Sequence, residues 1–308
     1  MKLGGSGGSG ERPGTAANAS GTATPTSLTS SISSLRLPRP LHGESVASAG
    51  SGLLVIGGAD RSDASTDEVL LLDPRASTVS PVGTLVAPLH DGAAVTRSGR
   101  TLVFGGGAST TLDTVQALTP GGAAQQVGRL PAAVSDLSAI EIGDAAYVIG
   151  GYDGQAPVAS ILRTTDGRSF TQPASLPTPL RYTAVAAIDD RIYTFGGELG
   201  SGADTDQIQE YDIATQRAVG AGRLPESVSH ASAVVLGGAI YLLGGRRNGR
   251  ASDRILRFDP SRKTAVPAGH LPAPLFDGAA GTFSGTAYLV GGINSQGTSV
   301  DSIVAVRP

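Results

Sequence analysis

The sequence predicts an all-β fold: a six-bladed β-propeller of four-stranded antiparallel blades. The first observation is a paired glycine that closes a short apolar run six times, at intervals of 45 to 48 residues. A period of this length is typical of propellers and solenoids. The second observation is a hairpin pattern around each pair, and the third is an outer strand displaced to the front of the chain. The six pairs are Gly57-Gly58, Gly105-Gly106, Gly150-Gly151, Gly196-Gly197, Gly244-Gly245 and Gly291-Gly292.

Each repeat reads as four strands. Six residues before the first glycine stands a turn residue, such as Asp144, with short apolar runs on either side. Two such runs around a tight Gly or Asp turn predict a β-hairpin. After the glycines come a polar loop, a third strand such as Ile208–Tyr211, and a fourth strand that ends in a Leu-Pro pair, as at Leu271-Pro272. Proline suits a strand end or an outer edge.

We expect little room for a Cβ atom at the glycine pairs, because the inner strands of a propeller converge on a narrow channel. Glycine also permits positive φ where the second strand turns into its loop.

The ring is expected to close through the N-terminal segment. The last repeat stops after its third strand, whereas residues 31–38 carry the outer-strand pattern ahead of the first repeat. This segment should complete the C-terminal blade and remove the exposed sheet edge. The predicted propeller therefore spans residues 31–308.

Two segments precede it. Residues 1–10, MKLGGSGGSG, read as an expression tag with a flexible linker. Residues 11–30 are rich in Ala, Ser, Thr and Pro and are expected to be a disordered leader, or a stalk joining the domain to a membrane anchor.

Composition excludes several kinds of function. The net charge of −3 without a basic stretch disfavours nucleic acid and anionic membranes as partners. No apolar stretch approaches the length of a membrane span, so no direct membrane insertion is expected. The absence of cysteine excludes disulfides, thiolate metal sites and thiol catalysis. We expect no cofactor and no metal.

The repeats resemble kelch repeats over residues 31–308. The resemblance is carried by Ile192–Gly197 and Ile240–Gly245, which read Ile-Tyr-x-x-Gly-Gly, and by Phe258-Asp259-Pro260. Kelch repeats often carry a tryptophan on the outer strand, but this chain has none, so we expect aliphatic side chains to make the contacts between blades. The family includes protein-binding adaptors, a copper oxidase and a sialic acid mutarotase. The oxidase uses a cysteine-linked tyrosine, which this chain cannot make.

A binding site is expected where the loops entering the first strands meet the loops after the glycine pairs. Residues at these positions differ between repeats, while the scaffold around them repeats. The candidates at the strand entry are His42, His90, Asp91, Asp136, Arg181, Tyr182, His230 and Asp277. The candidates after the glycine pairs are Tyr152, Glu198, Arg246 and Asn294.

Chemistry separates these candidates. His42, His90 and His230 belong to blades spread around the ring, so hydrogen bonds to neighbouring blades are favoured over a shared metal. The aspartates Asp91, Asp136 and Asp277 are expected to accept structural hydrogen bonds or, alternatively, to act in acid–base catalysis. Arg181 could bind a ligand carboxylate through bidentate hydrogen bonds, and Tyr182 offers a ring face and a hydroxyl to a ligand.

The sequence favours a non-catalytic domain that binds a protein or a small polar or acidic ligand at its loop face. We expect a monomeric, extracytoplasmic sensor or adhesion domain. Two alternatives stay open. One is an enzyme acting on a small acidic sugar, similar to the mutarotase, and the other is a scaffold for protein interaction. Fold alone does not choose among them.

Overall fold

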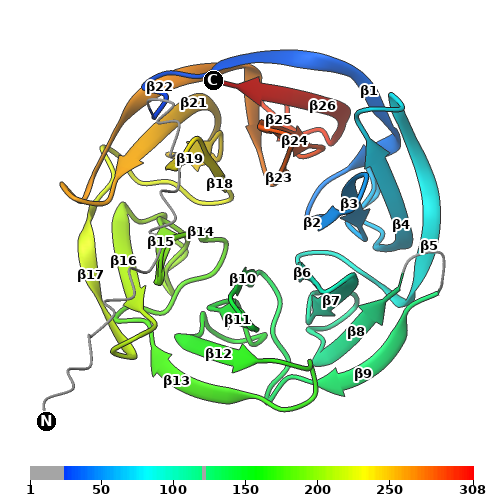
Figure 1. The fold of residues 1–308 in the computed structure, drawn as a ribbon, viewed down its shortest axis with the longest axis horizontal. Helices are drawn as coiled ribbons and strands as arrows, with labels where there is room; N and C mark the ends of the chain where they lie inside the picture. Colours follow the sequence, from blue (N-terminus) through cyan, green and yellow to red (C-terminus); the bar gives the residue numbers. More distant parts are fainter. Residues whose placement is uncertain (1–23, 120–122) are drawn as a thin grey trace, which may run out of the picture.

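The structure, a computed structural model, describes residues 24–119 and 123–308. Its sheets stand in a ring around a central channel (Figure 1). Four sheets have four strands each. The fifth joins two four-stranded runs through one parallel bridge between Arg223 and Thr264 and also includes two short strands. The predicted propeller of four-stranded antiparallel blades is confirmed. In the ranges described, no helix is long and apolar enough to cross a membrane.

Blades are numbered here from the N-terminal side of the first repeat. The first strands, which line the channel, are β2 (Ser45–Ala49), β6 (Ala93–Arg97), β10 (Ser138–Ile142), β14 (Ala184–Ile188), β18 (Ser232–Leu236) and β23 (Ala279–Phe283). The second strands are β3 (Gly52–Ile56), β7 (Arg100–Phe104), β11 (Ala145–Ile149), β15 (Arg191–Phe195), β19 (Ala239–Leu243) and β24 (Thr286–Val290).

The outer half of each blade follows the same order. The third strands are β4 (Thr66–Asp73), β8 (Thr114–Leu118), β12 (Ser160–Thr164), β16 (Gln207–Asp212), β21 (Arg250–Asp259) and β26 (Val300–Arg307). The outermost strands are β5 (Thr78–Leu89), β9 (Gln125–Arg129), β13 (Thr171–Ser175), β17 (Arg217–Arg223), β22 (Thr264–Phe276) and, from the N-terminal end, β1 (Thr29–Leu41). Two short strands, β20 (Arg246–Arg247) and β25 (Ile293–Asn294), lie in loops.

The ring closes as expected, because β1 pairs antiparallel with β26 and completes the C-terminal blade. The contact begins before β1. Leu28, which is buried, packs with Tyr241 of blade 5, and its N–H donates to the carbonyl of Ala268 at 2.7 Å. Pro25 and Leu28, which fall in the segment expected to be a leader, thus contact blade 5, and residues 29 and 30 of that segment belong to β1. The expected tag and residues 11–23 lie outside the described residues.

The glycine pairs hold the chain where it leaves one blade for the next. In each pair the second glycine donates its N–H to a carbonyl at the end of its own blade's outermost strand or in the connection that follows that strand; Gly197, for example, donates to Val228 at 2.8 Å. A Cβ on the first glycine, Gly196, would lie 2.0 Å from that same carbonyl oxygen. The space was expected to be limited by the channel, but it is limited by the backbone that leads from the blade's own outermost strand toward the next blade.

Aromatic side chains join several blades, so the expectation of purely aliphatic contacts is wrong. Tyr193 and Phe195 of blade 4 each stand 5.0 Å from the ring of Phe258 in blade 5. Tyr147 and Tyr211 meet in the same way across blades 3 and 4, with ring centroids 6.0 Å apart. These rings supply the large buried area that the missing tryptophan would provide.

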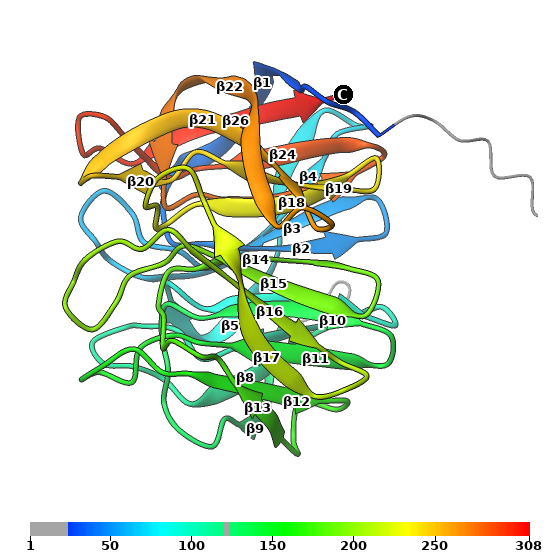
Figure 2. The ribbon, with the colours of Figure 1, turned by 90° about the vertical axis from the view of Figure 1, so that its left-hand side faces the viewer.

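The two faces of the ring differ. Figure 2 shows the loops after the second strands, including the one that contains β20, on the face away from the C-terminus. The outer strands β1 and β22 run further than predicted, β1 from Thr29 to Leu41. Strand β22 was expected to end at Leu271-Pro272 but runs on to Phe276, where it pairs with β25. Proline is tolerated there because β22 lies at the outer edge of its blade.

Candidate functional site

The chain enters every first strand through one residue in the left-handed region, with φ between +50° and +61°. These residues, called the entry ring below, are Gly43, Asp91, Asp136, Tyr182, His230 and Asp277. Each N–H donates to the carbonyl of the ring member in the preceding blade, at 2.7 to 3.0 Å. Gly43 closes the circle by donating to Asp277. Six backbone hydrogen bonds therefore run continuously around the mouth of the channel.

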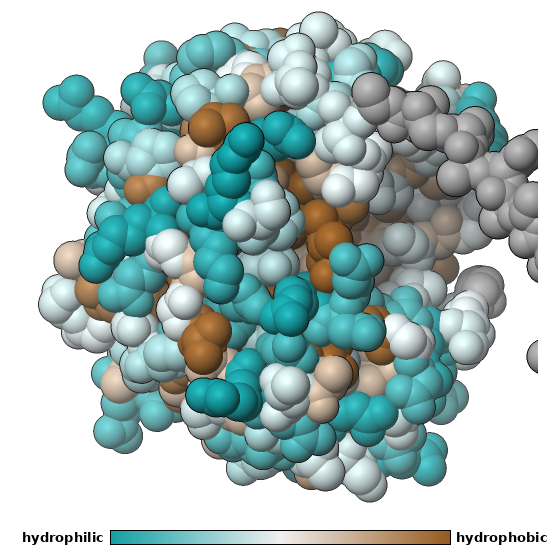
Figure 3. All heavy atoms as spheres, turned by 60° about the vertical axis from the view of Figure 1, so that its left-hand side comes forward, coloured by the Kyte–Doolittle hydropathy of each residue, from teal (hydrophilic) through white to brown (hydrophobic). Residues whose placement is uncertain are grey.

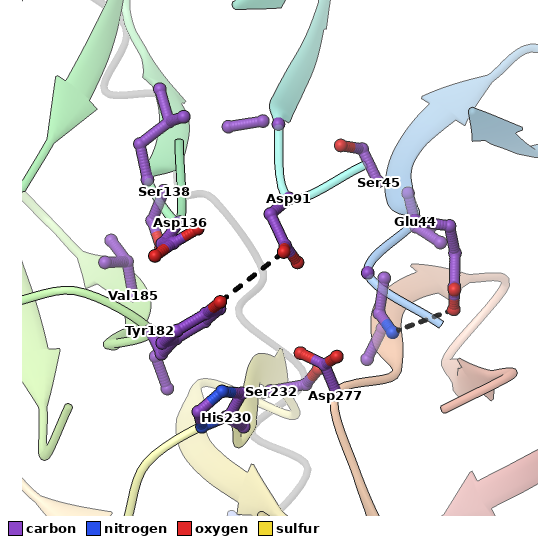
Figure 4. A pocket seen from close by; sticks show the side chains of 18 of the residues that line it. Glu44, Ser45, Asp91, Asp136, Ser138, Tyr182, Val185, His230, Ser232 and Asp277 are labelled. Atoms are coloured by element: carbon purple, nitrogen blue, oxygen red, sulfur yellow. Dashed lines mark hydrogen bonds between the residues drawn. The ribbon is translucent and has the colours of Figure 1, made fainter. Parts of the chain in front are cut away.

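The side chains of the entry ring converge on one pocket of about 200 Å³ (Figure 4). The hydroxyl of Tyr182 donates to Oδ2 of Asp91 at 3.5 Å. The Tyr182 ring stacks on the imidazole of His230, with centroids 3.7 Å apart and planes 22° apart. The Phe276 ring makes a T-shaped contact with His230, with centroids 5.9 Å apart. The pocket thus combines carboxyl groups with a fixed pair of flat rings.

Three aspartates of the entry ring share this pocket, and their pKa values are raised. Burial, followed by the charge of Asp136, raises the pKa of Asp277 to about 7. Burial raises the pKa of Asp91 well above its usual range, with further contributions from Asp277 and Asp136. Burial raises the pKa of Asp136, although a hydrogen bond from Ser135 and the charge of Arg181 each lower it in part. Such values follow from like charges gathered where water is scarce.

Glu44 lines the same pocket and escaped the sequence prediction. Its carboxyl is buried between blades 1 and 6, where Oε1 accepts the N–H of Ala279 at 3.2 Å. Oε2 is buried without a hydrogen-bond partner in the part of the chain that the structure describes. Burial raises the pKa of Glu44 to about 8. One signal was available: Glu44 is an acid at the position that holds Gly92, Leu137, Thr183, Ala231 and Gly278 in the other repeats.

The residues just before the entry ring face the loops instead of the pocket. His42 and His90 accept or donate a hydrogen bond through Nδ1 to Ser299 and Ser65 of the preceding blades, at 2.9 and 2.8 Å. The expected contacts to neighbouring blades are present for these two histidines. Nδ1 of His230 bonds to Ser229 beside it.

Burial lowers the pKa of all three histidines, and that of His230 falls to about 3. Among the residues that the structure describes, no group of three His, Asp or Glu side chains is arranged to hold a metal ion.

Arg181 belongs to an ion network at the rim. Its Nε donates to Oε1 of Glu198 at 2.9 Å, and its Nη1 lies 3.5 Å from Oδ2 of Asp136. The guanidinium also covers the ring of Tyr152 at 4.7 Å. Arg246 holds the other oxygen of Glu198 at 2.5 Å and reaches Asp204 at 2.9 Å. The donors with which Arg181 was expected to hold a ligand carboxylate are thus directed largely at the protein's own carboxylates.

The structure therefore divides the twelve candidates into two sets. Those that line the pocket are Asp91, Asp136, Tyr182, His230 and Asp277. Those that surround it in the rim and loops are His42, His90, Arg181, Tyr152, Glu198, Arg246 and Asn294. Asn294 shapes its own loop, because its Oδ1 accepts N–H groups from Gln296 and Thr298.

Comparisons with known proteins agree with this architecture. The kelch motif matches residues 227–264. The solved structure titled "Structure of YjhT" is similar to this chain with a TM-score of 0.77 and 16% identity, covering 90% of this chain and 100% of that one. No curated protein matches the sequence.

Proposed function

We propose that this chain, a kelch-repeat β-propeller, is a non-catalytic binding domain that takes a small polar ligand in the entry-ring pocket. The observation that carries the proposal is convergence: five side chains from five different blades meet in one pocket. Each is held by a backbone that is hydrogen-bonded to its neighbours on both sides. Such a preorganised set of groups loses little freedom when a ligand binds.

The setting of the domain is part of the same proposal. The Ala, Ser, Thr and Pro composition of residues 11–30 supports a stalk, and hence an extracytoplasmic sensor or adhesion domain. A protein scaffold would engage partners through its outer surface. The face shown in Figure 3 is mostly hydrophilic, with apolar side chains in small separate patches. This surface favours a polar partner over an apolar one.

A thermal-shift experiment tests the proposal. The protein is melted with neutral sugars, acidic sugars, amino acids and amines, alongside Asp277→Asn and the control Asp144→Asn. Asn tolerates the left-handed backbone at position 277, where φ is +60°. Asp144 lies in the turn between β10 and β11, outside the pocket. A ligand at a hundred times its Kd should stabilise the wild type by about 2.7 kcal/mol.

The expected result is a shift that the pocket variant loses and the control keeps. If no compound raises the Tm of the wild type by more than it raises the Tm of Asp277→Asn, binding in the entry ring is refuted.

A second candidate is an enzyme acting on a small sugar. The observation in its favour is the carboxyl of Asp277, whose pKa of about 7 suits proton transfer near neutrality. The Tyr182 hydroxyl stands in the same pocket. Anomeric exchange of added sugars, followed by NMR, distinguishes the two functions. Faster exchange with the wild type than with Asp277→Asn would establish catalysis, and equal rates would leave the binding proposal in place.

A further inference from the structure

We propose that a second site, the apolar pocket between blades 1 and 2, binds a small uncharged aromatic molecule such as a phenol or an indole. The pocket opens beside the turns that follow β2 and β6, at the opposite end of these strands from the entry ring (Figure 1). Among the described residues, none lines both pockets. The inference therefore goes beyond the proposed function and does not depend on it.

The first two repeats lack a ring that the other four carry. Three residues before the first glycine of the pair, the later repeats have Tyr147, Tyr193, Tyr241 and Tyr288, whereas the first two have Leu54 and Leu102. Each tyrosine belongs to the core that its blade shares with the next one. Blade 2 compensates for its leucine, because Phe104 meets Phe170 of blade 3 with ring centroids 6.3 Å apart. Blade 1 has no such replacement.

The core between blades 1 and 2 is therefore purely aliphatic. Within the described ranges it contains no aromatic side chain, whereas the other five cores between blades contain at least one. Ala124 of blade 2 holds the place that Phe170 holds in blade 3, so a second ring is missing as well. This chain has no further ring to supply, because residues 1–23 and 120–122 contain no Phe, Tyr or Trp. A ring that fills this space must come from another molecule.

The missing rings leave a cavity of about 380 Å³. A volume of this size is typical of small-molecule sites, and a dry cavity of about 150 Å³ already binds benzene in another protein. The apolar walls come from both blades and consist of Leu54, Val69, Leu71, Val82 and Leu118. Leu54, Leu71 and Val82 are only half-buried, so they leave apolar surface open to the pocket. A flat ring that covers this surface gains the free energy of removing it from water.

The polar groups of the pocket select an uncharged ligand. Among the described residues that line it, none carries a charge, so a bound ion would lose its hydration without gaining a partner. The hydroxyls of Thr96 and Thr101 lie 2.7 Å apart and bond to each other. One of the two donates to the other, and the hydrogen of the accepting hydroxyl and further lone pairs stay available to a ligand. A ring with one O–H or N–H group matches this lining.

Fluorescence titration with indole tests the inference on the full chain. The chain contains no tryptophan, so indole emission can be excited and followed apart from that of the protein tyrosines. The emission should shift to shorter wavelength and saturate, because the ring moves from water into an apolar site. Phenol should displace indole. Cyclohexanol, a thicker saturated ring, and benzoate, an ion, should bind about tenfold more weakly or not at all.

Two variants fill the cavity and two leave it open. Leu54→Tyr gives blade 1 the ring of the later repeats, so it should weaken indole binding at least about tenfold and melt at or above the wild-type Tm. Val82→Phe narrows the same cavity from β5 and should also weaken binding. Val266→Tyr adds a ring to an exposed position of β22, and Asp277→Asn alters the entry ring; both should bind indole like the wild type.

Each other outcome overturns the inference at a different point. If the indole emission shows no saturable shift, the pocket between blades 1 and 2 does not bind the ring. Binding that survives in both Leu54→Tyr and Val82→Phe places indole elsewhere on the protein, and binding lost only in Asp277→Asn assigns it to the entry ring. If cyclohexanol or benzoate binds as tightly as indole, the ligand class is wrong. None of these results bears on the thermal-shift test of the entry-ring pocket with polar ligands.

Discussion

At the scale of single residues, the entry ring restricts both backbone and side chain. A positive φ is easy for glycine and tolerable for Asp, Asn and His, but it is strained for a ring such as Tyr182. At Gly43 a Cβ would lie 2.6 Å from Oδ1 of Asp91, so this blade cannot contribute a side chain without moving that carboxylate. Blade 1 supplies Glu44 instead, one residue later. The pocket is thus asymmetric although the scaffold repeats.

The buried carboxyls should make stability depend on pH. Burial raises the pKa of Glu44 to about 8, whereas in the unfolded chain it lies near 4.3, as for a free side chain. Between these values the native state holds a proton that the unfolded state has lost, so stability falls as pH rises through this window. Glu44→Gln should remove the contribution of this carboxyl to the pH dependence of stability. The substitution should raise Tm by roughly 3 °C or more at pH 8, with a smaller gain at pH 5.

Melting curves between pH 5 and 8 measure this effect. The control is Glu68→Gln, which alters a surface ion pair with Arg39 and should leave the slope unchanged. If Tm varies with pH in the same way in the wild type and in Glu44→Gln, Glu44 is ionised in the native protein over this range and the prediction is wrong.

Side chains whose location depends only on their position in the repeat could be predicted from the sequence. Asp91, Asp136 and Asp277 share one position in the repeat, and the structure brings them into one pocket. Sequence reasoning could not show that Arg181 would be paired with Glu198, because that contact joins the strand entry to the loop of the same blade. It missed Glu44 although the unusual acid at this register was visible, because burial of the carboxyl against the neighbouring blade depends on how the ring closes.

At the scale of elements, each glycine pair fixes the connection that leads from its blade to the next. The first glycine leaves room for a carbonyl at the start of this connection, and the second donates its N–H to that carbonyl. The spacing of the pairs was enough to predict the hairpins and the repeat. The identity of the obstructing group was not predictable, because it follows two further strands of the chain and only the folded blade brings it close.

Two alanine substitutions separate close packing from backbone strain. In Gly196→Ala the new Cβ would stand 2.0 Å from the carbonyl oxygen of Val228, so backbone strain and loss of the contact with the connection between β17 and β18 should cost about 3 kcal/mol. Gly99→Ala has a similarly positive φ but open space around it, so it should cost about 1 kcal/mol. Chemical denaturation measures both. Equal losses would mean that the left-handed backbone alone accounts for the glycines.

At the scale of the whole molecule, β1 is the strand that makes the ring continuous. Leu28 packs between blades 5 and 6, while Leu35, Leu37 and Leu41 join the core shared by blades 6 and 1. One N-terminal segment therefore touches three consecutive blades. The displaced outer strand was predictable from the sequence, because the last repeat lacked it, but the contacts of Pro25 and Leu28 with blade 5 were not.

This arrangement predicts that the ring can be opened and restored. Residues 42–308 alone should lose the cooperative melting transition, because β26 keeps an unpaired edge and the buried leucines lose their partner. A synthetic peptide of residues 24–41 should restore it, with a Tm that increases with peptide concentration. The matched peptide carrying Leu37→Asp should fail, since Leu37 is 3% exposed and its pocket cannot accept a charge. A truncated protein that melts like the full chain would instead show that the other strands hold the ring closed without β1.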